Sequence, residues 1–491
     1  MNVLGIGGVL SDPAAALVSD GRIAAAVEEK KLTRTVETGR LPLASIQACL
    51  KIEGIRPDQV DFVALARPLP ADSAFAVALR MFSNARIVSI DHHAAHAASA
   101  WLASPFRDAV VITLDRQGDL RCGAKWRAEG NRLTLEREIL YPDSIGELFG
   151  SATELLGFRP RADEHLVQWL SATGQPRYKD AFANLTLDAK RFEGKTNDGE
   201  RADIAASAQQ ALEDYVVGLA GDARNLCLAG GIAWNALLIS RLENSGRYDG
   251  VFAQPAAGNA GTALGAALHV WNESVDPAAR LDGQGYCLGP GFAAAEIKQA
   301  LENCKLRFRL LPTIPETIGA AVQRLKEHRI VAWMQGRMEF GPRALGNRSI
   351  LASPEDRYSA ENLNNFIKHR QNFRKFAASV PAELADEYFT AGPNARYLAT
   401  VGRVKPAHKE RFQGAILAGD LIRVHSVRRE DNPLYWQLLH AFGEATGLPV
   451  LYNTSFNLFG EPLVCTPRDA VRSFYSSGID AMVAGNFLLE K

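Results

Sequence analysis

Short apolar runs and helical periodicities alternate along the first 270 residues of the chain. Runs of Val, Ile, Leu and Ala predict strands at residues 3–7, 15–18, 23–27, 60–64, 87–90, 109–114 and 226–229. Asp20-Gly21, between the second and third runs, is typical of a hairpin turn. Apolar positions at helical spacing predict helices at residues 43–52, 92–102 and 262–270. This alternation indicates a layered α/β fold.

A loop-like segment at residues 272–291 divides the chain. It is rich in residues that interrupt regular structure, namely Pro277, Gly283, Gly285, Gly289, Pro290 and Gly291. Beyond it, a helix at residues 318–326 and a strand at 330–333 begin a second α/β unit. We therefore expect two domains, residues 1–285 and 286–491. No internal repeat is visible in the sequence.

Composition and charge restrict the class of protein. Lys+Arg and Asp+Glu are both 55, so the net charge is zero, which argues against a nucleic-acid-binding or membrane-surface protein. The first residues carry no basic segment followed by a long apolar stretch, and no apolar stretch is long enough to span a membrane. The six cysteines are isolated from one another, as expected in a reducing compartment. We expect a cytoplasmic protein.

The N-terminal half contains candidate metal ligands. His92 and His96 are four residues apart on a predicted helix and therefore share one face. Asp115 ends a predicted buried strand, where side chains commonly face a ligand. Two imidazoles and a carboxylate suit iron, zinc or manganese. The alternative is a structural histidine pair with Asp115 capping a turn.

Two glycine-rich stretches in the same half suit phosphate binding. Gly230-Gly231 follows a predicted strand, and Gly258 to Gly265 opens a helix, where backbone N–H groups can hold an anion. Neither is a Walker motif. Tight turns and close helix packing also require glycine, so this reading stays open.

The C-terminal half combines arginines with amide and hydroxyl groups. Residues 336–349 carry three arginines and a single acid, and residues 364–374 are basic and aromatic, although a solvated helix has the same composition. Arg423 lies inside a strand-like run, and residues 451–457 place Asn453 and Ser455 after an apolar stretch. Guanidinium groups hold phosphate or carboxylate bidentately. These segments together predict an anion-binding pocket.

At this point the motifs resemble a known family. DHHAAHAASAW, LAGGIAWN, GRMEFGPRALGNRSILASP and the segment from NPLYWQLL to NTSFNLFGEPLV look like the O-carbamoyltransferase family of the NodU/CmcH type, nearly end to end. The resemblance implies an actin/Hsp70/sugar-kinase-like N-terminal domain and a YrdC-like C-terminal domain. It implies that carbamoyl phosphate and ATP, with its Mg²⁺, give carbamoyl adenylate, and that the carbamoyl group passes to a small-molecule hydroxyl or amine.

The resemblance also assigns roles to individual residues. It implies that Arg343, Lys368, Arg423, Asn453 and Ser455 bind carbamoyl phosphate. It implies that a divalent metal, most often iron, is held by the N-terminal residues His92, His96, Asp115 and Asn259. The nucleotide is expected beside the glycine-rich turns, at Gly230, Gly231, Asn235, Gly258 and Gly261.

Departures from the family pattern concentrate in the N-terminal half. Asn259 stands where the family's G-D-x-G motif has Asp, which should weaken metal binding. Ser11 and Val36 replace a His and a Lys, and residues 162–170 differ from G-E-x-K-V-M-G-L-A. We favour a working enzyme with a specialised acceptor. The alternative is a degenerate homologue that binds nucleotide or pairs with an intact carbamoyltransferase. A homodimer is also compatible with the sequence, and an actin-like kinase is a weaker third reading.

Overall fold

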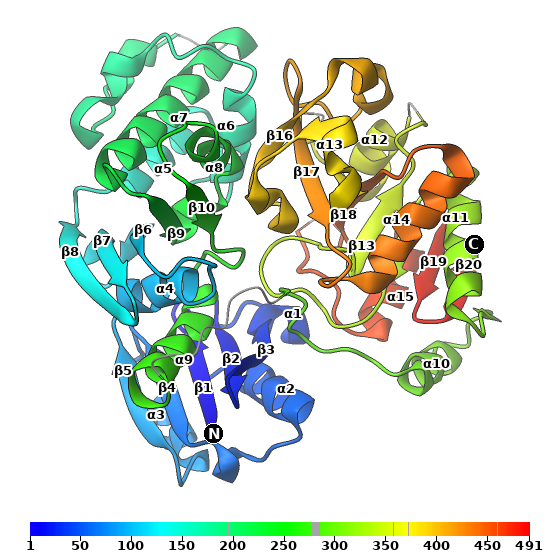
Figure 1. Cartoon of the computed structure of the whole chain (residues 1–491), viewed down its shortest axis with the longest axis horizontal. Coiled ribbons are helices and arrows are strands. Elements are labelled where there is room, and N and C mark those ends of the chain that lie inside the picture. The colour runs from blue at the N-terminus through cyan, green and yellow to red at the C-terminus, as the bar shows by residue number, and fades with distance from the viewer. Residues whose placement is uncertain (195–196, 277–284, 357, 372, 459) are drawn as a thin grey trace.

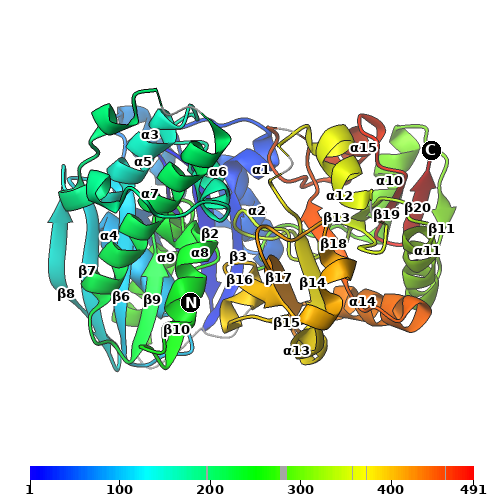
Figure 2. The same cartoon turned by 90° about the horizontal axis from the view of Figure 1, so that it is seen from above.

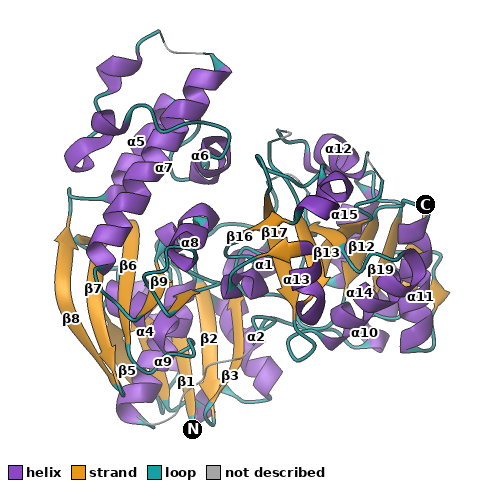
Figure 3. Ribbon diagram, turned by 45° about the horizontal axis from the view of Figure 1, so that its top comes forward, coloured by secondary structure: helices purple, strands orange, loops and turns teal. Residues whose placement is uncertain are grey.

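The structure is a computed structural model of the chain, and it describes residues 1–194, 197–276, 285–356, 358–371, 373–458 and 460–491. Two lobes lie side by side in Figure 1, and the view from above separates them in the same way (Figure 2). The first lobe holds two five-stranded sheets and the second a ten-stranded sheet. Figure 3 shows the helices packed against these strands. The predicted α/β class is confirmed.

The two N-terminal sheets repeat one strand order. The first sheet runs β3-β2-β1-β4-β5 and consists of β1 (Asn2–Gly7), β2 (Ala14–Ser19), β3 (Arg22–Glu28), β4 (Phe62–Ala66) and β5 (Arg86–Ile90). The second runs β8-β7-β6-β9-β10 and consists of β6 (Ala109–Gly118), β7 (Arg121–Glu129), β8 (Arg132–Leu140), β9 (Asn225–Ala229) and β10 (Gly250–Ala253). Each has three antiparallel strands followed by two parallel ones. This duplication agrees with the actin-like fold that the resemblance implied, and the sequence did not reveal it.

Two helices lie between these sheets. α4 (His92–Trp101) and α9 (Gly261–Ser274) pack on each other and on strands of both sheets. Their approach depends on glycine, because a Cβ on Gly265 would lie 1.7 Å from the carbonyl oxygen of Ala95. The lobe's other helices are α1 (Glu29–Thr33), α2 (Leu43–Glu53), α3 (Ser73–Ala78), α5 (Ile145–Leu155), α6 (Glu164–Ser171), α7 (Asp198–Ala220) and α8 (Ala236–Glu243).

The C-terminal sheet runs β11-β20-β19-β12-β13-β18-β14-β17-β16-β15. Its strands are β11 (Arg309–Leu310), β12 (Val331–Met334), β13 (Arg348–Ala352), β14 (Ala377–Pro381), β15 (Phe389–Thr390), β16 (Val401–Val404), β17 (Leu421–Val427), β18 (Leu451–Ser455), β19 (Ala481–Ala484) and β20 (Phe487–Glu490). The accompanying helices are α10 (Ala294–Asn303), α11 (Ile314–Lys326), α12 (Ser359–Asn362), α13 (Ala385–Tyr388), α14 (Pro433–Thr446) and α15 (Pro467–Tyr475). Residues 277–284 of the predicted linker lie outside the described residues, and the boundary at 285/286 stays a prediction.

A buried ion pair joins the two lobes. Lys31 Nζ lies 2.9 Å from Glu28 Oε1 and donates to the carbonyl oxygens of Glu339 and Gly341, at 2.9 and 2.7 Å. Glu28 Oε1 also accepts the backbone N–H of Gly341, at 2.9 Å. Both side chains are 4% exposed. The start of α1 therefore fixes the loop that leads to Arg343. No helix in the described part of the chain has the length and apolarity needed to cross a membrane.

Candidate active site

Three of the predicted metal ligands converge at the start of α4. His92 Nε2 lies 2.8 Å and His96 Nε2 3.0 Å from the same oxygen, Asp115 Oδ2. The three ligand atoms all lie within 4.8 Å of one another, and all three residues are buried. The helix starts at His92 because the Asp91 carboxylate caps it, accepting from the backbone N–H groups of His93 and Ala94.

Neighbouring backbone groups orient these side chains. His92 Nδ1 faces the carbonyl oxygen of Arg67 at 3.2 Å, which directs Nε2 inward. Asp115 Oδ1 accepts the N–H of Gly231 at 2.5 Å. Gly118 leaves room for the ring, because a Cβ there would lie 2.2 Å from His92 Cδ2. Asp115 lies within β6, just past Leu114 where the pairing with β7 shifts in register, and it faces the turn that follows β9.

The protonation states suit a metal site. Burial lowers the pKa of His96, so its ring is neutral and offers a lone pair. Burial also acts to lower the pKa of His92, but the hydrogen bond and charge of Asp115 outweigh it and raise that pKa. Burial acts to raise the pKa of Asp115, yet the neighbouring His96 and His92 hold it well below its usual value. Two imidazoles and one ionised carboxylate fit a divalent transition metal.

Asn259 borders the same cavity. The space beside the three ligands has a volume of about 390 Å³. It is lined by Gly8 to Ser11, Arg67, Pro68, His92, Gln117 to Leu120 and Asn259. The Asn259 side chain donates to Ser11 Oγ at 2.7 Å. Two positions that depart from the family pattern, Ser11 and Asn259, are therefore hydrogen-bonded to each other at the mouth of the cavity. The role of Asn259 as a ligand stays a prediction.

The glycines expected beside a nucleotide have packing roles in the structure. A Cβ on Gly230 would lie 2.2 Å from the oxygen of Leu114, one on Gly258 would lie 2.3 Å from the Trp234 ring, and one on Gly261 would lie 1.8 Å from the oxygen of Ala256. Gly231 supports Asp115, as described above. Asn235 caps α8 by accepting from Leu238 N and pairs with Gln209. These contacts account for the residues, and their nucleotide role stays a prediction.

A second cavity lies in the C-terminal lobe against α6 of the N-terminal lobe. Its volume is about 170 Å³. Four arginines and a lysine line it: Arg343, Arg370, Arg374, Arg423 and Lys375. Its described lining residues include no Asp and no Glu. The lining is therefore strongly positive, which suits an anion.

The arginines lower one another's pKa values. Burial, followed by the charge of Arg374, lowers the pKa of Arg343 to about 10 and that of Arg370 to about 9. Burial and the charges of the other three arginines hold the pKa of Arg423 well below its usual value. These shifts mean that burial and the neighbouring cations disfavour positive charge on the arginines, and an anion bound in the cavity would stabilise that charge.

Arg423 is held by stacking. Its guanidinium carbon lies 5.4 Å from the ring centre of Trp169, which belongs to α6. Its Nε is buried and has no hydrogen-bond partner among the described residues. Trp169 in turn packs with Ala236 of α8 and Val401 of β16. The N-terminal lobe thus sets the position of a C-terminal arginine.

Asn453 and Ser455 reach the cavity from the end of β18. Asn453 Nδ2 donates to Ala344 O at 3.1 Å and to Ser379 Oγ at 3.2 Å, while its Oδ1 is buried without a partner. That oxygen is free to accept an N–H group. Ser455 Oγ donates to Asn457 Oδ1 at 2.7 Å.

Lys368 lies behind the cavity wall instead of lining it. Its Nζ donates to Ser455 O at 2.5 Å, to Asn457 O at 2.9 Å and to Asn457 Oδ1 at 2.7 Å. Burial and the charges of Arg370 and Arg374 hold its pKa well below the usual value. In the structure, Lys368 therefore fixes the turn that carries Ser455, and any direct contact with ligand stays a prediction.

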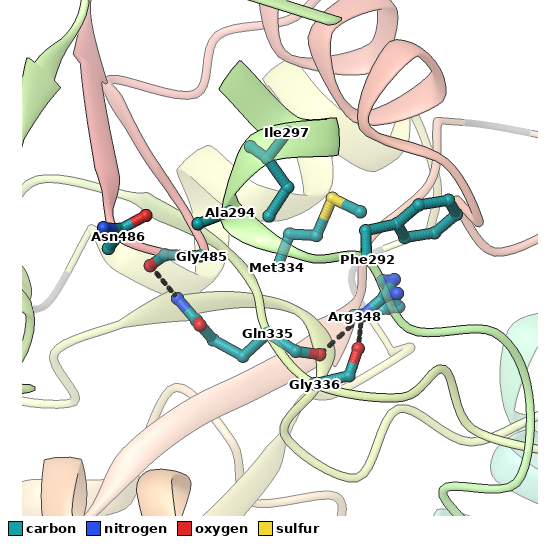
Figure 4. Close-up of a pocket in the computed structure, with 9 residues that line it drawn as sticks. All are labelled: Phe292, Ala294, Ile297, Met334, Gln335, Gly336, Arg348, Gly485 and Asn486. Carbon is teal, nitrogen blue, oxygen red and sulfur yellow. Dashed lines mark hydrogen bonds between the residues drawn. The ribbon is translucent and has the colours of Figure 1, made fainter. Parts of the chain in front are cut away.

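Only one arginine of residues 336–349 reaches the cavity. Arg337 donates to the carbonyl oxygens of Ala24 and Gly289, at 2.9 and 3.0 Å. Arg348 is fully buried and donates to Gln335 O at 2.6 Å and to Gly336 O at 3.3 Å, beside a separate pocket shown in Figure 4. Both therefore act structurally, which the count of arginines in the sequence did not show.

Sequence reasoning missed part of the cavity. Arg370 and Arg374 lie in the basic stretch that was noted, but they were not singled out. His165, Gln168 and Trp169 come from α6, about 175 residues before Arg343. The only available signal was that their segment departs from the family motif.

Comparison with known proteins identifies the family of the chain. A family model described as carbamoyltransferase N-terminus matches residues 69–198 and 177–268, and one described as carbamoyltransferase C-terminus matches 322–491. A Synechocystis protein is 33% identical over 100% of this chain and 97% of its own length. Nodulation protein NolNO of Sinorhizobium fredii is 31% identical over 98% of this chain and 79% of its own. The 3'-hydroxymethylcephem-O-carbamoyltransferase of Amycolatopsis lactamdurans is 30% identical over 53% and 48%.

Two solved structures each align with part of the chain. ROK hexokinase from Thermus thermophilus covers 56% of this chain and 100% of its own, with a TM-score of 0.32 and 19% identity. P. abyssi Sua5 covers 35% of this chain and 48% of its own, with a TM-score of 0.27 and 14% identity. The family models and the relatives' identity carry the assignment: this chain belongs to the carbamoyltransferase family of the NodU/CmcH type, and it is a transferase.

Proposed function

We propose that this enzyme makes carbamoyl adenylate from carbamoyl phosphate and ATP in the arginine-lined cavity, and then transfers the carbamoyl group to a small-molecule hydroxyl or amine. The observation that carries this proposal is the cavity itself. Arg343, Arg370, Arg374 and Arg423 surround a space whose described lining contains no carboxylate. An acyl phosphate and a nucleoside triphosphate supply the negative charge that would balance these arginines.

The carbamoyl end of the substrate has a matching acceptor. Asn453 Oδ1 is buried and unpartnered, and its amide nitrogen is already held by Ala344 O and Ser379 Oγ. A carbamoyl NH₂ group can donate to this oxygen, whereas an acetyl group has no N–H to offer. This contact favours a carbamoyl over an acetyl phosphate, because a buried acceptor left without a donor costs about 1–3 kcal/mol.

The overall reaction includes water. Carbamoyl phosphate, ATP and water give carbamoyl adenylate, pyrophosphate and orthophosphate. The P–O bond of carbamoyl phosphate breaks, and the carbamate oxygen replaces pyrophosphate on the α-phosphorus of ATP. Arg343 and Arg423 stabilise the charge that develops on the phosphoryl oxygens.

The acceptor half of the reaction belongs at the N-terminal cavity. His92, His96 and Asp115 would hold the divalent metal, and a metal there supplies Lewis acidity toward an acyl oxygen or a hydroxyl. Arg67 and Ser11 line the space in front of these ligands and can orient an acceptor. The presence of all three residues, His92, His96 and Asp115, argues against a degenerate homologue.

The test measures pyrophosphate. The protein is incubated with carbamoyl phosphate and ATP, and pyrophosphate and adenylate are quantified together. We expect equal amounts of both, dependent on both substrates. Arg423→Met should abolish the signal, while Arg307→Met, an exposed site, should not. Absence of both products from the native enzyme would refute the proposal.

A further inference from the structure

His165 is the one imidazole on the wall of the arginine-lined cavity among the described residues. It is the second residue of α6, so it comes from the N-terminal lobe. Its Nδ1 lies 3.1 Å from the carbonyl oxygen of Ala162. A carbonyl oxygen only accepts, so Nδ1 carries the proton and Nε2 keeps its lone pair.

The reaction proposed above needs a proton acceptor in this cavity. When water attacks the phosphorus of carbamoyl phosphate, a P–O bond forms to water and the P–O bond to carbamate breaks. The products are carbamate, hydrogen phosphate and one proton. The remaining titratable lining groups are four arginines and Lys375, which are cationic and donate.

We propose that His165 Nε2 accepts this proton, so that a residue of the N-terminal lobe is catalytic in the C-terminal cavity. This inference rests on the proposed function. The neutral amide Asn453 and the hydroxyl of Ser455 are not bases at neutral pH. Lys368 is excluded because its Nζ already donates to Ser455 O and to two oxygens of Asn457.

The surroundings keep the imidazole neutral. Although part of the His165 side chain is exposed, partial desolvation at the cavity wall, together with the charges of Arg374 and Arg343, lowers its pKa to about 4, while Asp163 acts in the opposite direction. A bound phosphate dianion offsets the two arginines and raises that pKa toward neutrality. The ring thus becomes a better proton acceptor when substrate arrives.

The experiment distinguishes the role of Nε2 from that of Nδ1. His165→Asn keeps an amide N–H that can reach Ala162 O, but it has no counterpart of Nε2. We measure orthophosphate and pyrophosphate release, together with the dissociation constant for inorganic phosphate. We expect both release rates to fall about 10²–10⁴-fold, the usual contribution of a general base, with phosphate affinity changed less than threefold. His328→Asn, at an exposed site outside the cavity lining, is the matched control.

The pH profile gives a second readout. In the native enzyme the rate at saturating substrate falls as pH drops through the pKa of His165 in the complex, and this limb should be missing in His165→Asn. Lys375→Gln should still show this fall in rate at low pH.

Three results overturn the inference. They are a His165→Asn rate within threefold of native, an equal loss of rate and phosphate affinity, or a limb that disappears only in Lys375→Gln. If the native enzyme releases neither orthophosphate nor pyrophosphate, the proposed function is wrong, and so is the inference that rests on it.

Discussion

Replacing Lys31 by Met tests whether the buried ion pair holds the two lobes together. Met keeps the length of the side chain but removes the contacts of Nζ with Glu28 and with the carbonyl oxygens of Glu339 and Gly341. It leaves the Glu28 carboxylate buried, at 4% exposure. Removing one partner of a buried pair costs about 3–5 kcal/mol. Glu28 still accepts the N–H of Gly341, so we expect the lower end, about 3 kcal/mol.

The assay is thermal unfolding followed by calorimetry. The unfolding entropy of about 2.1 cal/mol/K per residue gives roughly 1 kcal/mol/K for 491 residues, so Tm should fall by about 3 °C if the chain unfolds as one unit. Adding Glu28→Gln to Lys31→Met removes the unpaired charge and should restore part of the loss. Val36→Met, an exposed site, serves as the control. An unchanged Tm in Lys31→Met, or a double variant less stable than the single one, would show that the pair does not stabilise the lobes.

Three further outcomes test the two sites. Gly118→Ala places a methyl group 2.2 Å from His92 Cδ2, so we expect about 10–100-fold weaker metal binding by elemental analysis across a metal titration, whereas Gly319→Ala, which contacts nothing, should bind as native does. Asn259→Asp adds a charged oxygen beside the ligands and should tighten metal binding about tenfold; unchanged affinity would place Asn259 outside the ligand set. Arg423→Met should weaken inorganic phosphate binding in calorimetry about 10–100-fold, because a charge-assisted hydrogen bond contributes about 1.5–3 kcal/mol, and an unaltered affinity would contradict the assignment of this cavity.

Local chemistry made much of the fold predictable. The Asp20-Gly21 hairpin is present between β2 and β3, and the helix predicted from residue 92 begins there because Asp91 caps it. The strand predicted at residues 109–114 continues to Gly118, because a shift in register lets β6 pair again beyond Leu114. The duplicated sheet order could not be predicted, since the two halves share strand order but no visible sequence pattern.

The sites were predictable only where the ligands lie close in sequence. His92, His96 and Asp115 meet as expected because a helix turn and a neighbouring strand end bring them together. The count of arginines did not distinguish Arg343, which faces the cavity, from Arg348, which is bound by backbone carbonyls. Only the packing of α6 on the C-terminal lobe places Trp169 beside Arg423, and no local pattern encodes that contact.

The repeated sheet has a consequence for how acceptor preference can change. The residues that follow β1 and those that end β6 occupy equivalent places in the two copies, and both border the cavity beside His92. The β6 copy supplies Asp115, while the β1 copy supplies Gly8, Val9, Leu10 and Ser11, which touch the cavity without forming part of the histidine–carboxylate cluster. The β6 copy is thus constrained by the histidine–carboxylate cluster, and Ser11 of the β1 copy is tied to Asn259, whereas a change at the exposed Leu10 would reshape the cavity wall without touching that cluster.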